Sequence, residues 1–202
     1  MTLVVNGLRK RLGGREVLRG VDCAVADGEC LAVFGANGAG KSPLLAALAG
    51  ILDPDAGHAE LDGAPLLAAR ADVGWVPEAA DPPPHLSADE LVELVAALRR
   101  RSRPPADTLA RLGWPELAAR RIGAMSLGQR RRACLGAALV GPPRLLLLDE
   151  PTNGLDASAH QTLCALLREY LQTGRSALVA THDSAFAAAI GARVVTLTDG
   201  RL

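Results

Sequence analysis

The fold is decided by eight consecutive residues, Gly35-Ala36-Asn37-Gly38-Ala39-Gly40-Lys41-Ser42. An apolar run at 30–34 precedes them and an Ala/Leu-rich run at 44–49 follows, which predicts the order strand, glycine loop, helix. Glycines let backbone N–H groups turn toward phosphate oxygens, and the N-terminus of the helix adds unpaired donors and a positive dipole end. Lys41 has the reach for the β- and γ-phosphates, and the Ser42 hydroxyl suits Mg²⁺. We therefore predict a nucleotide-binding loop; the plainer alternative is a Gly-rich turn.

Further polar residues stand where two other apolar runs end. The run at 145–148 leads into Asp149 and Glu150, and the run at 177–181 leads into His182. Such runs are typical of strands buried on both faces of a parallel sheet, whose carboxyl ends meet at one edge. Asp149 is then placed to share Mg²⁺ with the serine of the loop, and Glu150 to deprotonate an attacking water. The alternative for all three is a purely structural role.

Composition narrows the class of protein. The chain has 202 residues, enough for one large domain or one domain with a lobe, and its formal net charge is zero, which argues against a nucleic-acid or anionic-lipid partner. None of the four cysteines forms a C-x-x-C pair, which favours buried, reduced thiols over disulfides or a metal site. No apolar run approaches the ~20 residues that span a bilayer. We expect a cytoplasmic protein without direct membrane insertion.

The order of predicted elements indicates an α/β fold with a mostly parallel sheet, an N-terminal antiparallel β portion and an inserted helical lobe. Strands are expected at 2–6, 16–25, 30–34, 59–61, 73–76, 145–148 and 176–180, helices at 91–98, 106–112, 115–121, 157–172 and 184–190, and hairpins around 13–14 and 193–202. Ser87 and Glu90 resemble a capping box. We predict a single domain, 1–202, whose core spans 1–78 and 141–202 and whose helical subdomain spans 79–140.

The whole chain resembles a nucleotide-binding subunit of the ATP-binding cassette (ABC) family, whose core is that of the P-loop NTPases. Five motifs carry the resemblance, in the family's order: a Walker A loop at 35–42, the signature Met125-Ser126-Leu127-Gly128-Gln129, a Walker B strand at 145–150, a D-loop at 154–156 and a switch histidine at His182. The signature separates this family from other P-loop proteins.

The resemblance implies a mechanism that uses ATP and Mg²⁺. Two cassettes, identical or different, would pack head to tail, with ATP between the Walker A loop of one and the signature of the other. Glu150 would be the general base, and His182 would sense the γ-phosphate. The signature residues would act in trans, at the start of a helix. Four further residues complete the implied site: Ser42, Asp149 and Glu78 toward Mg²⁺, with Glu78 also toward the attacking water, and Asp156 in the D-loop.

Four positions depart from the family pattern. Leu12 stands where an aromatic residue usually stacks on adenine, so we expect weaker base selectivity. Pro43 replaces a hydroxyl residue and removes an N–H donor, which predicts weaker nucleotide binding. Glu78 stands where Gln is usual, and Leu127 replaces a Gly of the signature; both resemble exporter-like branches.

Two arginine runs, at 99–101 and 130–132, invite a nucleic-acid hypothesis. We favour solvated helix faces instead, because net charge is zero and aromatic side chains for base stacking are few. No nucleic-acid partner is therefore expected.

The function expected from the resemblance is an ATP-hydrolysing subunit that energises an ABC transporter, more specifically an exporter similar to haem-exporter cassettes. It would need a second cassette and separate transmembrane permease subunits, and would sit on the cytoplasmic face of the membrane through them. No C-terminal regulatory domain is expected after the last hairpin. Two alternatives stay open: a soluble ABC ATPase without a transporter, such as one serving iron–sulfur assembly, and a nucleotide-binding regulatory subunit with little turnover.

Overall fold

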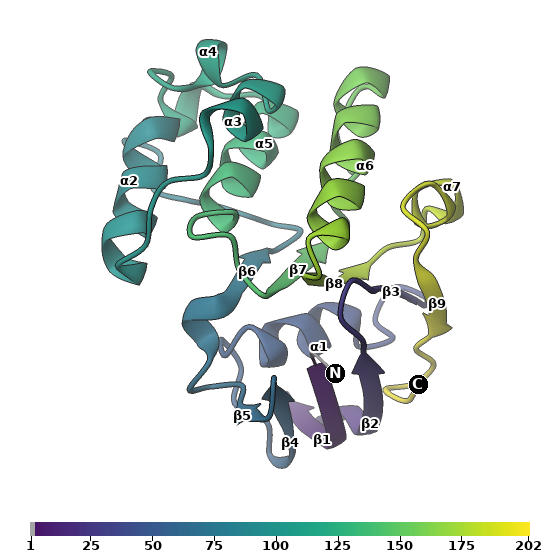
Figure 1. The fold of residues 1–202 in the computed structure, drawn as a ribbon. Coiled ribbons are helices and arrows are strands. Elements are labelled where there is room, and N and C mark those ends of the chain that lie inside the picture. Colours follow the sequence, from purple (N-terminus) through teal and green to yellow (C-terminus); the bar gives the residue numbers. More distant parts are fainter. Residues whose placement is uncertain (1–2) are drawn as a thin grey trace.

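The computed structural model describes residues 3–202, which form two sheets flanked by helices (Figure 1). An antiparallel sheet has the order β2-β1-β4-β5 and a parallel sheet the order β6-β7-β8-β3-β9. The strands are β1 Leu3–Leu12, β2 Arg15–Val25, β3 Cys30–Phe34, β4 Ala56–Leu61, β5 Ala64–Pro65, β6 Val73–Val76, β7 Leu145–Asp149, β8 Ser176–Ala180 and β9 Arg193–Thr196. The expected α/β fold, with a parallel sheet and an N-terminal antiparallel part, is confirmed.

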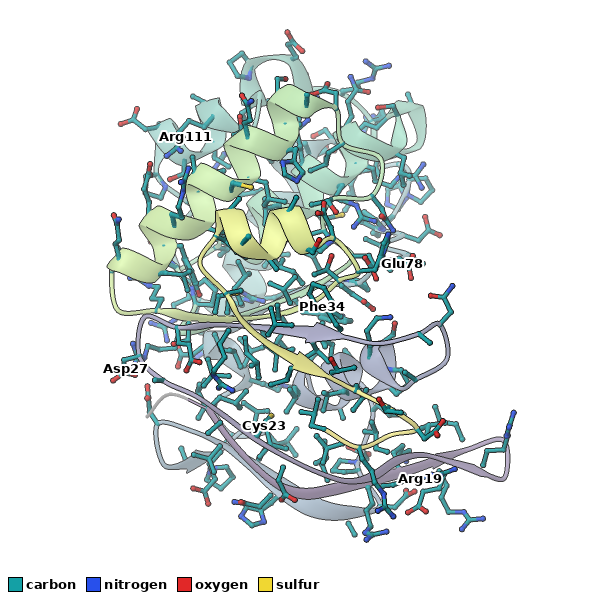
Figure 2. The ribbon with its side chains drawn as sticks, turned by 90° about the vertical axis from the view of Figure 1, so that its right-hand side faces the viewer. Arg19, Cys23, Asp27, Phe34, Glu78 and Arg111 are labelled. Carbon is teal, nitrogen blue, oxygen red and sulfur yellow. The ribbon has the colours of Figure 1, made fainter. Side chains whose placement is uncertain are left out.

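Helices cover both faces of the parallel sheet. They are α1 Lys41–Leu48, α2 Ala88–Arg99, α3 Ala106–Arg111, α4 Trp114–Leu117, α5 Leu127–Ala138, α6 Ala157–Gln172 and α7 Ser184–Ala189, with short 3₁₀ turns at Arg70–Asp72 and Ile122–Ala124. Figure 1 shows α1 between the two sheets and α6 on the opposite side of the parallel sheet, beside the group α2 to α5. Figure 2, turned by 90°, shows the same layers edge-on. Within residues 3–202, no helix is both long and apolar enough to cross a membrane.

Alternation along the buried strands divides the core in two. In β7, Leu145 and Leu147 join the cluster shared with α1 and the antiparallel sheet, whereas Leu146 and Leu148 join the cluster shared with α5 and α6. Successive strand residues point to opposite faces, so a strand between two helical layers needs apolar side chains at every position. This explains why the run preceding Asp149 is continuously apolar.

Most element expectations hold, with four differences. The expected helix at 115–121 is too long: α4 ends at Leu117, because the carbonyl groups of Ala118 and Arg120 accept hydrogen bonds from the first turn of α2. The expected strand at 59–61 begins earlier, at Ala56, because β4 pairs with β1 as far as Arg9. The expected strand at 2–6 extends to Leu12, and Thr2 lies outside the described residues. The expected hairpin at 193–202 is wrong: β9 instead pairs in parallel with β3, and only an isolated bridge joins Thr198 to Arg201. The Val-rich segment completes the edge of the parallel sheet, which satisfies its backbone better than a hairpin would.

Candidate nucleotide site

The glycine loop leads from β3 into α1, as predicted, and two of its glycines have no room for a side chain. A Cβ on Gly40, which caps the helix with φ 111°, would lie 2.6 Å from the carbonyl oxygen of Val17. A Cβ on Gly35 would lie 2.5 Å from the carbonyl oxygen of Leu197. Both distances are shorter than any van der Waals contact. The loop therefore packs closely against β2 and the C-terminal segment. Only glycine fits at these two positions.

Lys41 is buried at the first position of α1 and folds back over the loop. Its ammonium donates hydrogen bonds to the carbonyl oxygens of Gly35, at 2.6 Å, and Ala36, at 3.4 Å. Its Nζ also lies 4.0 Å from Oε1 of Glu150. A buried ammonium is stable only with such acceptors, and phosphate oxygens entering the loop would offer stronger ones.

Asp149 and Ser42 meet the needs of a magnesium ion. Asp149 is 2% exposed, and its Oδ1 is buried without a hydrogen-bond partner. Burial raises the pKa of the Asp149 carboxyl; a hydrogen bond with Ser42 opposes this shift, while the carboxylates of Glu78 and Glu150 add to it. A cation bound here would supply the missing partner. Among residues 3–202, no cluster of three or more acidic, His or Cys side chains is suited to a metal by itself.

Glu150 adopts a strained backbone conformation. Its φ is +45°, in the left-handed region that non-glycine residues occupy at a cost of about 1–3 kcal/mol. Its N–H donates to the carbonyl oxygen of Ala180, at 2.8 Å. Its carboxylate is buried, and Oε2 lies 2.9 Å from Nδ1 of His182. A buried carboxylate of this kind is suited to general-base work.

One cavity of about 540 Å³ brings most of the predicted site residues together. Its lining comes from β2, the loop, α1 and the ends of β6, β7 and β8, and consists of Val17, Ala36, Asn37, Gly38, Gly40, Lys41, Ser42, Pro43, Glu78, Asp149, Glu150, Asn153 and His182. The structure does not bring Leu12 to this cavity; that side chain lies at the end of β1 and is 40% exposed. A phosphate-binding loop, carboxylates and an imidazole thus share a single space.

The signature residues lie outside this cavity, at the start of α5. Ser126 caps the helix: its Oγ accepts from the N–H of Gln129 at 3.3 Å, and its own N–H donates to the Gln129 side chain at 3.0 Å. Leu127 is 56% exposed, and a Cβ on Gly128 would lie 2.6 Å from the carbonyl oxygen of Gly154. The signature thus packs on the D-loop and leaves an exposed helix start. The N-terminus of a helix is a favourable place for an anion.

Asp156 has a local structural role in the chain itself. Its carboxylate accepts hydrogen bonds from the N–H of Ala159 and from the Ser158 hydroxyl. Asp156 is thereby the N-cap of α6. These hydrogen bonds hold the pKa of Asp156 below its usual value. The residue is therefore ionised, and the turn before α6 is fixed.

Sequence reasoning missed three residues around the site. Val17 and Asn153 line the cavity, and Asn153 Nδ2 lies 3.4 Å from Oε1 of Glu78. Arg131 contradicts the expectation of solvated arginine runs, since it is 7% exposed and its guanidinium reaches inward. Val17 had no clear signal in the sequence, because the burial of β2 does not alternate regularly around it. Neither Asn153 nor Arg131 had a signal in the periodicity, because both depend on long-range packing.

Pro43 lines the cavity in the first turn of α1, where it leaves the helix intact. Leu44 makes the first helical hydrogen bond, to Gly40 at 2.9 Å, so no intrahelical bond is lost. The N–H that proline lacks belongs to the donors that would otherwise face a phosphate.

We therefore expect Pro43→Thr to tighten ATP binding about 5- to 30-fold, or about 1–2 kcal/mol, because it restores an N–H and adds a hydroxyl. Titration calorimetry measures the change. The matched control is Pro115→Thr, since Pro115 also lies in the first turn of a helix, α4, and is remote from the cavity. An unchanged Kd in Pro43→Thr would contradict this reasoning.

Comparisons with known proteins agree with this geometry. The profile of a family described as ABC transporter matches residues 18–153. The aliphatic sulfonates import ATP-binding protein SsuB of Pseudomonas entomophila is 40% identical over 200 residues, which cover 98% of this chain and 73% of that protein. The Fe(3+) ions import ATP-binding protein FbpC of Streptomyces coelicolor is 37% identical over 209 residues, covering 99% of this chain and 60% of that protein. Both are named as import proteins, so they lend no support to the exporter-like expectation.

Solved structures match in fold as well. An ATP-binding subunit of an ABC transporter superposes with a TM-score of 0.90 at 26% identity, covering 100% of this chain and 88% of the other. A dimeric ATP-binding cassette in a post-hydrolysis state, bound to ADP and Pi, superposes with a TM-score of 0.89 at 25% identity, covering 99% and 96%.

Proposed function

The chain belongs to the ABC transporter family as an ATP-binding subunit and an ATPase, and we propose that two such cassettes close head to tail on two ATP molecules to drive transport. In each composite site, the cavity of one chain would hold the nucleotide and the exposed start of α5 in the other chain would cover its γ-phosphate. We take the second cassette to be a further copy of this chain, so that the chain supplies both halves of each site.

The observation that carries this proposal is the cavity itself, where Lys41, Asp149, Glu150 and His182 converge. Lys41 would exchange its loop carbonyls for phosphate oxygens. Asp149 and Ser42 would hold Mg²⁺, which neutralises charge on the transferred phosphoryl group when bound. Glu150 would accept a proton from the attacking water, and His182 beside it would orient that water or donate to the γ-phosphate.

Incompleteness of the site within one chain supports the two-chain arrangement. The signature residues lie outside the cavity, and Leu127 at the start of α5 is 56% exposed, whereas the second half of that helix is buried. A phosphate bound by Lys41 would have no cover from α5 of the same chain. The dimeric state of a similar cassette points the same way.

We propose that the transport energised by this subunit runs inward. The support comes from the printed names of relatives, SsuB and FbpC, both called import ATP-binding proteins. They match almost equally at 40% and 37% identity, yet one is named for aliphatic sulfonates and the other for Fe(3+) ions. Cargo selection therefore resides in other subunits, which we take to be transmembrane permeases that hold this subunit at the membrane.

The segment 79–140 is the proposed helical subdomain. It contains α2 to α5 and, among the described residues, no extended strand, whereas the parallel sheet occupies the flanking segments. Figure 1 shows this group as a layer beside α6, to which Arg111 of α3 is joined by an ion pair with Glu169. A separate lobe carrying the signature would be able to rotate toward the second cassette.

The direct test is ATP turnover at saturating ATP over a range of protein concentrations. If the active species is a pair, turnover per chain rises with concentration and then reaches a plateau, because dilution separates the pair. A turnover per chain that is independent of concentration down to the nanomolar range, with a monomeric mass throughout, would refute the two-chain site.

A further inference from the structure

Arg131 joins the signature helix to the hydrolytic residues of its own chain. It lies in the second turn of α5 and is 7% exposed. Its Nη1 donates to the carbonyl oxygens of Asp149, at 3.3 Å, and of Glu150. Its Nη2 donates to the carbonyl oxygen of Glu78, at 2.9 Å. A single planar guanidinium therefore connects the end of β7 with the loop that follows β6.

The contact to Glu150 matters because the backbone there is strained. A non-glycine residue stays in the left-handed region only where its surroundings hold it there. The N–H of Glu150 is held by Ala180, and its carbonyl group is held by Arg131 and the N–H of Asn153. Of these three partners, only Arg131 contributes a side chain. A substitution of Arg131 therefore removes one of the hydrogen bonds that hold the Glu150 backbone.

We propose that Arg131 is a positioning residue for hydrolysis: its guanidinium keeps the strained Glu150 backbone, and with it the carboxylate, in place over the nucleotide cavity. The proposal rests on the function proposed above. Burial lowers the pKa of the Arg131 guanidinium, and the negative charges of Glu78, Asp149 and Glu150 oppose this shift and favour the charged form. Lysine would keep the charge but lacks the fork that reaches three carbonyl groups at once.

The same residue ties the start of α5 to Glu150 within one chain. Arg131 is five residues from Ser126, about 7.5 Å along the helix. One helix therefore carries both the capped start at Ser126 and the guanidinium that holds the carbonyl group of Glu150.

The experiment measures kcat and ATP affinity for the full-length Arg131→Gln and Arg131→Lys variants. We expect kcat to fall about 10- to 100-fold in Arg131→Gln, as for a misplaced catalytic group, and less in Arg131→Lys. The Kd for ATP stays within twofold, because Arg131 does not line the cavity. Melting temperatures show which variants are folded. If Arg131→Gln does not fold, the kcat and ATP affinity of Arg131→Lys alone test the proposal.

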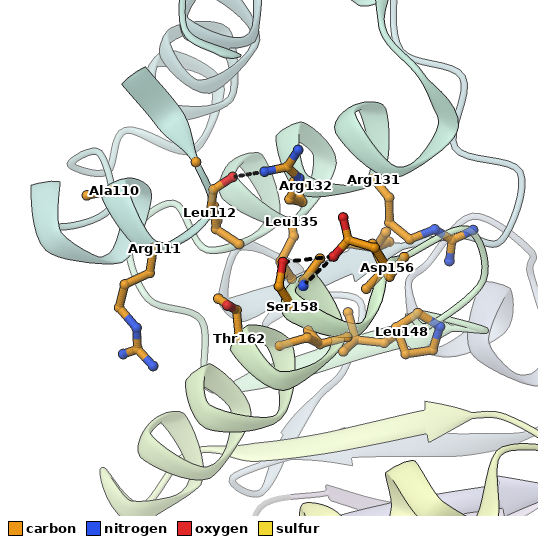
Figure 3. A pocket seen from close by; sticks show the side chains of 16 residues that line it. Ala110, Arg111, Leu112, Arg131, Arg132, Leu135, Leu148, Asp156, Ser158 and Thr162 are labelled. Atoms are coloured by element: carbon orange, nitrogen blue, oxygen red, sulfur yellow. Dashed lines mark hydrogen bonds between the residues drawn. The ribbon is translucent and has the colours of Figure 1, made fainter. Parts of the chain in front are cut away.

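The matched control is Arg132→Gln, next along the same helix. Figure 3 shows both side chains, with Arg132 hydrogen-bonded to the carbonyl oxygen of Leu112 at 3.2 Å. Arg132 makes no hydrogen bond to the end of β7, so its variant keeps kcat within about twofold of the native protein while losing a comparable backbone contact.

A second readout separates positioning from general destabilisation. On the Glu150→Gln background, where hydrolysis is blocked, Arg131→Lys is expected to dimerise at the same ATP concentration as its parent. The inference is overturned if kcat is unchanged in a folded variant, or if kcat, ATP affinity and dimerisation weaken in parallel. If the native chain itself has no turnover, the function proposed above fails instead.

Discussion

Glu150→Gln is expected to lower ATP turnover by about 10²- to 10⁴-fold, because the amide cannot accept the proton of the attacking water. The change preserves size and the buried environment, so folding and ATP binding are retained. The Glu150 carboxylate lies 4.0 Å from Lys41 and 2.9 Å from His182, and all three residues line the cavity. Steady-state phosphate release measures the effect, and a single-turnover assay separates hydrolysis from product release.

The matched control for this substitution is Glu116→Gln. Glu116 is exposed on α4, away from the cavity, and its amide variant keeps the native rate. If Glu150→Gln hydrolyses ATP within a few-fold of the native protein, Glu150 is not the general base. The assignment would then have to pass to Glu78 or His182.

Lys41→Met is expected to weaken ATP binding about 10- to 150-fold, which corresponds to the loss of about 1.5–3 kcal/mol from a hydrogen bond to a charged group. Methionine matches the length and apolar stem of lysine but has no donor for the phosphates. The native ammonium is buried and already donates to the loop carbonyl of Gly35 at 2.6 Å. Titration of a fluorescent ATP analogue measures the loss of affinity.

Lys10→Met provides the comparison, because Lys10 is the only other lysine in the chain. It lies on β1, pairs with Asp55 at 2.9 Å and is not part of the cavity. Its variant keeps the native Kd for ATP. Equal affinities for Lys41→Met and the native protein would show that the loop does not bind the phosphates through this side chain.

Local patterns were sufficient to predict most of the fold. Continuous apolar runs predicted β3, β7 and β8, and the paired residues Ser87 and Glu90 predicted the capped start of α2. The segment after α7 was mispredicted, because Val194 and Val195 fit a hairpin as well as an edge strand. Only the parallel pairing with β3 distinguishes the two arrangements.

Site residues could be predicted from the sequence only where a chemically suitable side chain directly follows a predicted strand. Lys41, Asp149, Glu150 and His182 follow strands, so topology alone brings them to one edge of the sheet. Arg131 is different: its neighbours in the run, Arg130 and Arg132, are partly exposed while Arg131 is buried. Nothing in the sequence shows which of three adjacent arginines faces inward. Likewise, the left-handed backbone of Glu150 follows from contacts with distant residues, not from its own residue type.

The most direct test of the composite site is the mass of the Glu150→Gln protein with and without ATP, measured by light scattering, together with a Leu127→Glu change on the same background. Leu127 is exposed at the start of α5, where an acidic residue stabilises the helix but would repel the phosphate of the opposing chain. Leu98→Glu, at an exposed position of α2, is the control.

We predict that ATP shifts the Glu150→Gln protein from 20.9 kDa to twice that mass. We also predict that Leu127→Glu abolishes this shift without changing ATP affinity of the single chain, and that Leu98→Glu leaves the shift intact. A protein that stays at the mass of one chain with ATP bound, or a Leu127→Glu variant that dimerises like its parent, would contradict a nucleotide held between the cavity of one chain and the signature of another.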